Sequence, residues 1–283
     1  MGGGLSISEV AEQSGLAAGT IRMWEQRYGF PEPSRTGAGY RVYVEGDVEA
    51  LRRVMAYRHR GLSVPAAIER ARETGGPSDH PSIYAAVASS DHGGRPQVLR
   101  KSTLVAISRA IEHETLAQAA APVLFGAFQQ ERFYREVEPR YRRIAQFSDA
   151  AVAFADFDEV HRPPGGPIEV PIAPEDKLGN EWAVIIDAPG YATCLLAWEL
   201  PGTIEPGDAN DMRRRFEAIW TLNPRAVRKA AQVAARLAGR ADPELGARLE
   251  KLLDERPLAR EEPSPTVTAL TNRMVSYMET ALT

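Results

Sequence analysis

Residues 21–43 read IRMWEQRYGFPEPSRTGAGYRVY, and this stretch decides the fold of the first quarter of the chain. Ile21, Trp24 and Tyr28 have the i, i+3, i+7 spacing of one buried helix face. Glycine and proline residues directly after Tyr28 end that helix. The glycines of the Gly37–Gly39 turn then allow two short strands to pair. The stretch therefore predicts a helix followed by a small two-stranded wing.

The residues before this stretch predict a partner helix. Ala11, Gly15 and Ile21 place a small residue, a turn glycine and an apolar anchor at the spacing of a helix-turn-helix. The two helices are expected at residues 8–14 and 18–28, and two more at 47–60 and 63–73. Residues 1–73 are therefore predicted to form a winged helix-turn-helix domain.

The charge distribution also distinguishes residues 1–73 from the remainder of the chain. The whole chain carries 34 basic and 38 acidic residues, a net charge of −4. Residues 1–73 contain ten Arg and nine Asp or Glu, which leaves a net charge of −5 for the remainder. Most basic residues are Arg, which binds phosphates and guanine edges in a forked geometry, although a GC-rich coding sequence produces the same bias. Local basic charge favours contact with a nucleic-acid backbone.

The predicted interface with double-stranded DNA comprises the outward face of the second helix and the wing. The helix is expected in the major groove and the wing on the phosphate backbone. Trp24 is predicted to lie in the core, and for Tyr43 packing beneath the wing is an equal alternative. The predicted DNA-binding residues are Thr20, Arg22, Gln26, Arg27, Arg35, Tyr40, Arg41 and Tyr43.

These motifs resemble the MerR family of transcriptional regulators, especially members whose helix ends in Trp-Glu-x-Arg-Tyr-Gly. The run Leu5–Ala11, Pro33-x-Arg35 and Gly39-Tyr40-Arg41-x-Tyr43 carry the rest of the resemblance. It implies a homodimer on promoter DNA, acting on RNA polymerase. Many members have Tyr where this chain has Met23, so a phosphate contact there is not expected.

The remainder of the chain predicts a linker at 74–97 with space for one short helix at 82–89, an α+β domain at 98–240 and a helical tail at 241–283. The domain is expected to have a mixed or antiparallel sheet with flanking helices. Strands are predicted at 123–128, 151–155, 168–172, 182–187 and 193–199, and helices at 131–147, 209–221 and 224–238.

This second region resembles the DICT sensory domain. The resemblance rests on motifs such as Ser108-Arg109-Ala110-Ile111-Glu112, Ala155-Asp156-Phe157 and Asp187-Ala188-Pro189-Gly190. It implies a module that receives a signal. Phe133, Tyr134, Trp182 and Trp198 are the candidate ligand-binding residues, with ordinary core positions as the alternative for the tryptophans.

The sequence gives little support to metal, cofactor or enzyme chemistry. The single cysteine, Cys194, lies in an apolar run and is expected to be a buried hydrophobe, too few thiolates for a soft-metal site. The segment Glu159–Gly165 only approaches the Asp-x-His-x-x-Gly loop by which relatives bind cobalamin, so no cofactor is predicted. Asp156 and Asp158 at a strand end are expected to cap a loop rather than catalyse. No enzyme activity and no membrane partner are predicted, and the expected location is the cytoplasm.

The last helix has apolar residues at alternating spacings of three and four, from Val267 through Leu270, Met274 and Tyr277 to Ala281. Docking on its own domain and contact with a second copy both remain open. The leading hypothesis is a dimeric DNA-binding regulator controlled by a small-molecule or protein signal. The alternative is a DNA-tethered scaffold whose second domain binds a protein partner. Operator, signal and direction of regulation are not determined by the sequence.

Overall fold

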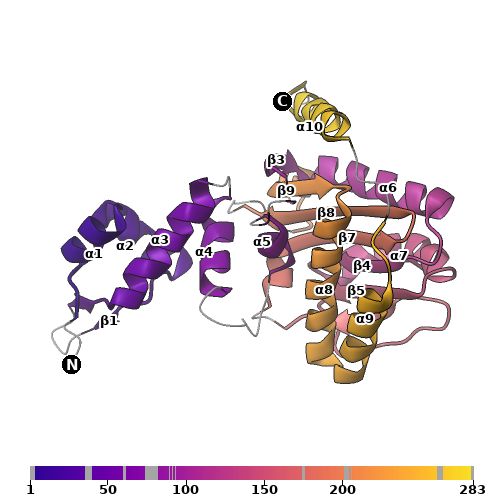
Figure 1. The fold of residues 1–283 in the computed structure, drawn as a ribbon, viewed down its shortest axis with the longest axis horizontal. Coiled ribbons are helices and arrows are strands. Elements are labelled where there is room, and N and C mark those ends of the chain that lie inside the picture. Colours follow the sequence, from indigo (N-terminus) through magenta and orange to yellow (C-terminus); the bar gives the residue numbers. More distant parts are fainter. Residues whose placement is uncertain are drawn as a thin grey trace. The chain divides into compact units, whose positions relative to one another are not determined.

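The computed structural model describes residues 4–35, 40–59, 62–73, 82–88, 90, 92, 94–173, 176–200, 204, 206–259 and 264–281. The chain divides into two compact units, Met1–Ser78 and Asp79–Thr283. Figure 1 shows the helices of the first unit and the sheet of the second. The predicted Gly37–Gly39 turn lies outside the described residues.

The first unit is a helix-turn-helix with a small wing. Its helices are α1 (Ile7–Ser14), α2 (Ala18–Tyr28), α3 (Glu45–His59) and α4 (Val64–Glu73). The wing strands β1 (Ser34–Arg35) and β2 (Arg41–Val42) pair antiparallel.

Local signals set the ends of the first two helices. Ser6 and Glu9 form a capping box at the start of α1, in which each side chain bonds the other residue's backbone N–H. Gly15 and Gly29 end α1 and α2 with φ angles of 73° and 60°, a left-handed conformation that costs glycine little. Ile21 and Trp24 are buried as predicted, whereas Tyr28 is only half-buried.

The second unit is built on a seven-stranded mixed sheet in the order β3-β9-β8-β7-β4-β5-β6. The strands β4, β5 and β6 run parallel to one another, and the other neighbours pair antiparallel. The strands are β3 (Gln97–Arg100), β4 (Val123–Ala127), β5 (Ala150–Ala155), β6 (Ile168–Pro171), β7 (Glu181–Ala188), β8 (Tyr191–Glu199) and β9 (Arg215–Thr221).

Helices cover both faces of this sheet (Figure 1). On one face α6 (Lys101–Gln118) packs on β3, β7 and β8, and α7 (Glu131–Ala145) packs on β5. The other face is covered by α5 (Ile83–Ala88) and α8 (Pro224–Ala241), with α9 (Pro243–Glu255) against α8. Successive strand residues are buried on opposite faces, so the strands read as continuous apolar runs.

One close approach shows how tightly α7 is seated. A Cβ atom on Gly126 of β4 would lie 2.7 Å from a ring carbon of Tyr141. Tyr141 is fully buried with Tyr134 and Phe128 in the core on this face. Glycine at this position therefore allows the tyrosine ring to rest on the strand.

Two predictions about secondary structure differ from the structure. The predicted helix at 209–221 is a short 3₁₀ turn followed by β9, which β3 and β8 flank on both sides. Pairing with two strands satisfies the β9 backbone and overrides its local helical preference. The short helix that the predicted linker at 74–97 could hold is present as α5, but all of its residues are buried, and Gln97 is the first residue of the edge strand β3.

The last helix, α10 (Pro265–Ala281), contacts β3 at the edge of the sheet. The backbone N–H of Arg100 donates to Glu279 Oε1 at 3.1 Å, and the Thr103 hydroxyl donates to the other carboxylate oxygen. Val275 packs against the core. One side of α10 thus docks on its own domain.

Candidate nucleic-acid interface and apolar pocket

The outward face of α2 carries the predicted groove-reading side chains. Arg22, Gln26 and Arg27 are exposed, and Thr20 near the helix start is half-buried. Burial of Ile21 and Trp24 on the opposite side fixes the rotation of the helix, because residues three apart share a face. The structure therefore brings three of the predicted contacts to one surface of α2.

The wing carries three further predicted contacts. Arg35 of β1 lies opposite Arg41 of β2 in the antiparallel register, and both side chains are exposed. Tyr40 is 74% exposed. These residues present cationic and aromatic groups to solvent beside α2.

Glu25 joins the wing to α2. Its Oε2 accepts a hydrogen bond from Arg41 Nε at 2.6 Å, and its Oε1 accepts one from the Tyr43 hydroxyl. Tyr43 is fully buried, and burial, aided by the Glu25 carboxylate, raises the pKa of its phenol. Tyr43, predicted as a DNA contact, is therefore placed in the interior, where it supports the wing.

Arg52 on α3 contacts the end of α1. Its guanidinium donates two hydrogen bonds to the carbonyl oxygen of Gln13, at 2.9 and 2.6 Å from Nε and Nη2. Gln13 lies in the last turn of α1, where carbonyl groups lack helical partners. Among the described residues of the first unit, Arg52 thus connects α3 to the end of α1.

The four predicted ligand-binding residues do not meet in one pocket. Trp182 donates from Nε1 to Ser108 Oγ at 3.0 Å, on the α6 face of the sheet. Trp198 pairs across strands with Glu181, the neighbour of Trp182, so it points to the other face. It is 6% exposed.

Phe133 and Tyr134 also have packing roles. The Lys101 ammonium lies 3.9 Å from the centroid of the Phe133 ring. Tyr134 is fully buried against Phe128 and Phe157, with ring centroids 5.4 and 5.6 Å away. Burial raises the pKa of Tyr134, so its hydroxyl stays neutral within the core.

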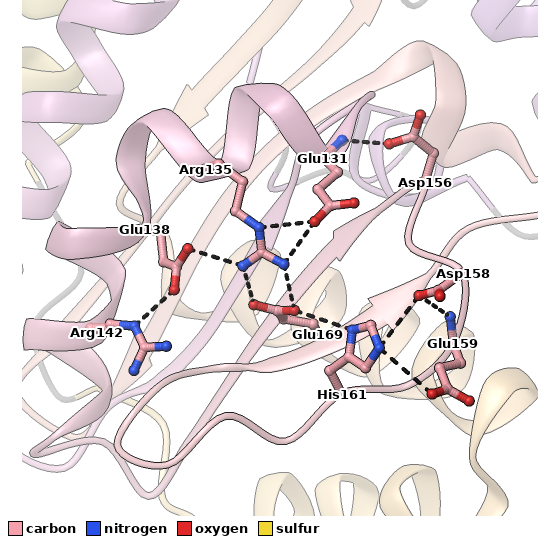
Figure 2. Close-up of polar contacts among 9 residues, drawn as sticks. All are labelled: Glu131, Arg135, Glu138, Arg142, Asp156, Asp158, Glu159, His161 and Glu169. Carbon is pink, nitrogen blue, oxygen red and sulfur yellow. Dashed lines mark hydrogen bonds and ion pairs between the residues drawn. The ribbon is translucent and has the colours of Figure 1, made fainter.

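The acidic residues at the end of β5 form a polar cluster, which Figure 2 shows. Asp156 accepts from the backbone N–H of Glu131 at the start of α7, which agrees with the predicted capping role. Asp158 accepts from the Glu159 N–H at 3.0 Å and lies 3.3 Å from His161 Nε2.

The buried carboxylate in this cluster is Glu169 of β6. Arg135 Nη1 and Nη2 bind its two oxygens at 2.5 and 2.9 Å, and His161 Nδ1 lies 3.4 Å from Oε2. Glu131 and Glu138 pair with the same arginine (Figure 2). Because Arg135 of α7 binds both oxygens of Glu169 on β6, the cluster ties α7 to the end of the sheet.

A cavity of about 690 Å³ lies between α6, the sheet and α10. One wall is the α6 face that includes Ala106, Ala110 and Glu114. The sheet contributes Tyr191 and Thr193 of β8 with Trp220 of β9, and Leu222 follows. Val275 and Met278 of α10 form the remaining wall.

None of the four predicted ligand-binding residues lines this cavity. Trp220, which does line the cavity, lies in the segment 209–221 that was predicted as a helix and that contains the strand β9 in the structure. The available signal was the row of small residues Ser102, Ala106 and Ala110, spaced by four on one face of α6.

Comparison with protein families agrees with this division. Residues 5–74 match the MerR HTH family regulatory protein, and residues 81–200 match the sensory domain in diguanylate cyclases and two-component system, DICT. The chain joins a MerR HTH domain to a DICT sensory domain. Residues 210–282 also match the C-terminal domain of a two-partite extracellular sensor domain.

The curated relatives resemble the MerR domain alone. HTH-type transcriptional repressor CarA of Myxococcus xanthus is 46% identical over 70 residues, which are 24% of this chain and 24% of that protein. CarH, a transcriptional repressor of the same organism, is 39% identical over 22% of this chain and 20% of its own length. HTH-type transcriptional regulator AdhR of Bacillus subtilis is 37% identical over 23% of this chain and 46% of its length. The chain thus covers a quarter or less of the first two relatives, and these relatives are regulators rather than enzymes.

Neither a membrane-spanning helix nor a cluster of metal ligands is found among the described residues. No described helix combines the length and hydropathy of a membrane span. Within the same ranges, no three His, Cys, Asp or Glu side chains come together as metal ligands.

Proposed function

We propose that the chain is a transcription regulator that binds double-stranded promoter DNA as a homodimer, with its DNA affinity set by a signal received in the DICT domain. The observation that carries this proposal is the surface formed by Arg22, Gln26 and Arg27 of α2, in a domain whose relatives are transcriptional regulators. The cytoplasm and contact with RNA polymerase at the promoter belong to the same proposal.

The α2 helix enters the major groove, with Thr20 and Arg22 nearest the bases. An arginine fork recognises guanine O6 and N7 there, and other arginines neutralise phosphates. Arg35 and Arg41 on the wing bind the backbone beside the groove. The Glu25 carboxylate holds Arg41 in place, so the wing meets DNA with its arginine already oriented.

Regulation requires the signal to favour one dimer geometry over another. A ligand shifts such an equilibrium only by its difference in affinity between the two states. The two units are joined through residues 74–81, so the signal is transmitted through this connection or through contacts between the two copies.

A gel-shift titration of the full chain on its own upstream DNA tests the proposal. Arg22→Ala is expected to weaken binding by about 1–3 kcal/mol and to reduce the salt dependence if it contacts phosphate. Arg236→Ala, at an exposed position on α8, is the matched control and should bind like the parent chain. Unchanged binding by both Arg22→Ala and Arg41→Ala would refute the assigned interface.

A further inference from the structure

The cavity beneath α10 is open to solvent along α6, where Ser102, Ala106 and Ala110 are exposed. The core elsewhere is filled by buried side chains on both faces of the sheet. Ligand sites for small organic molecules typically enclose roughly 300–1,000 Å³ and are mostly apolar, and this cavity of about 690 Å³ lies in that range. Its size exceeds what a packing defect leaves in a close-packed interior.

One polar group beside the cavity lacks a partner. Trp220 lines the cavity, and its indole Nε1–H is buried with no hydrogen-bond acceptor among the described residues. Leaving such a donor unpaired costs about 1–3 kcal/mol. The nitrogen itself has almost no accessible surface, so a molecule in the cavity contacts the Trp220 ring and not this donor.

The charge of the lining restricts the molecule. Among the described lining residues, Glu114 is the charged one, and its Oε1 accepts from Gln118 Nε2 at 2.6 Å. The remaining lining side chains are aliphatic or aromatic, with hydroxyl groups from Ser102, Thr103, Tyr191 and Thr193. An anionic ligand would meet a carboxylate and no cation in this lining.

We infer that this cavity is the signal site of the DICT domain and takes an uncharged, largely apolar small molecule that packs against the Trp220 ring. The inference deepens the proposed function, since it names the site and chemical class of the signal. A small molecule is the occupant because α10 of the same chain already forms the outer wall through Val275 and Met278.

The same wall gives the ligand a route to the rest of the molecule. Glu279, the residue after Met278, binds Arg100 and Thr103 and so fixes α10 over the cavity. A molecule that contacts α10 and α6 together stabilises this docked position. The position of α10 therefore depends on whether the cavity is occupied, and a partner that binds the outer face of α10 responds to that difference.

Fluorescence titration of the purified full chain with Nile red tests the site, because this dye is uncharged, largely apolar and small enough for the cavity. Saturable binding with one dye per chain is expected. Ala110→Trp fills the cavity and should weaken binding at least about tenfold. Ala117→Trp makes the same change at an exposed position of α6 that does not line the cavity, and should bind like the parent chain.

A conservative variant covers the case in which Ala110→Trp does not fold. Trp220→Phe removes the five-membered ring of the indole and with it part of the aromatic wall, so dye binding should weaken about two- to tenfold. Glu114→Gln should leave Nile red binding unchanged and strengthen binding of the anionic dye 1-anilinonaphthalene-8-sulfonate. Absence of saturable Nile red binding, or equal binding by the parent, Ala110→Trp and Trp220→Phe chains, overturns the inference.

The dye titration contains no DNA, so its result is independent of the gel shift. A chain that binds Nile red in this cavity but no DNA would overturn the proposed function and leave the pocket standing. A chain that binds DNA through Arg22 but has no saturable dye site would overturn the pocket assignment and leave the proposed function standing.

Discussion

The Tyr43 hydroxyl donates a hydrogen bond to the Glu25 carboxylate, which connects the wing strand β2 to the helix α2. Arg41, two residues before Tyr43, donates to the other oxygen of the same carboxylate at 2.6 Å. One acidic residue of α2 thus orients the wing. The sequence feature that looked like two DNA contacts, Arg41 and Tyr43, separates into one exposed arginine and one buried support.

Removing the Tyr43 hydroxyl should loosen the wing without deleting any exposed cation. Tyr43→Phe is expected to destabilise the head by about 1–2 kcal/mol, because a largely buried carboxylate loses a donor. Hydrogen exchange of the α2 amides measures this loss of stability in the first unit alone. Tyr40→Phe, at an exposed wing position, is the control. Exchange rates in Tyr43→Phe equal to those of the parent chain would contradict the supporting role.

The pH dependence of this contribution has a defined sign. Burial raises the pKa of Tyr43 above its ordinary value near 10, and the Glu25 carboxylate raises it further. A folded-state pKa above the unfolded one means that the stabilisation is complete below the unfolded pKa and is lost as the pH rises through the folded pKa. Urea unfolding at about pH 8 and about pH 11 should therefore show a larger difference between parent and Tyr43→Phe at the lower pH. A difference that grows with pH would reverse the sign and reject the assignment.

The outer face of α10 is expected to hold the homodimer together. Leu270, Met274 and Tyr277 are 58%, 53% and 67% exposed, while Val275 on the other side packs inward. Met274→Glu together with Tyr277→Glu should convert dimers to monomers in light scattering, because two charges enter an apolar contact. Met212→Glu, at an exposed methionine elsewhere in the same unit, serves as control. Dimers that persist in the double variant would place the contact on another surface.

Cys194 should be unreactive until the sensory domain unfolds. It is fully buried in β8, and burial raises the pKa of its thiol to about 12. Since the thiolate is the reactive form, a thiol-specific chromogenic reagent should label the native chain slowly and label one thiol per chain after denaturation. Rapid complete labelling in native buffer would show that this part of the sheet opens readily.

The DNA-binding head follows closely from local sequence. The apolar spacing of Ile21 and Trp24 predicted the buried face of α2, and the predicted helix limits agree with the observed Ala18–Tyr28. Five predicted strands of the sensory domain were also confirmed, because runs such as Val123–Ala127 are apolar throughout. Helix periodicity and buried strands are patterns over a few neighbouring residues, so one sequence suffices to recognise them.

The parts that were missed depend on residues far apart in the chain. The strand β9 exists because β3 and β8 supply partners on both sides, about 115 residues before and 20 residues before it, respectively. The helix α5 is buried because Glu181, which follows it by almost 100 residues, accepts hydrogen bonds from Ser82 and from the backbone of Ile83 and Tyr84. Neither relation leaves a local pattern.

The sequence by itself determined the helix-turn-helix, its exposed arginines and five strands of the sensory domain, since side-chain size, charge and spacing act within each element. Only the tertiary structure decided that Tyr43 supports the wing, that Trp182 and Trp198 lie on opposite faces, and that Trp220 borders a cavity. These outcomes depend on strand register and on how α6 and α10 meet the sheet. Such contacts are set by the packing of the whole unit, because an empty space is defined by every wall around it.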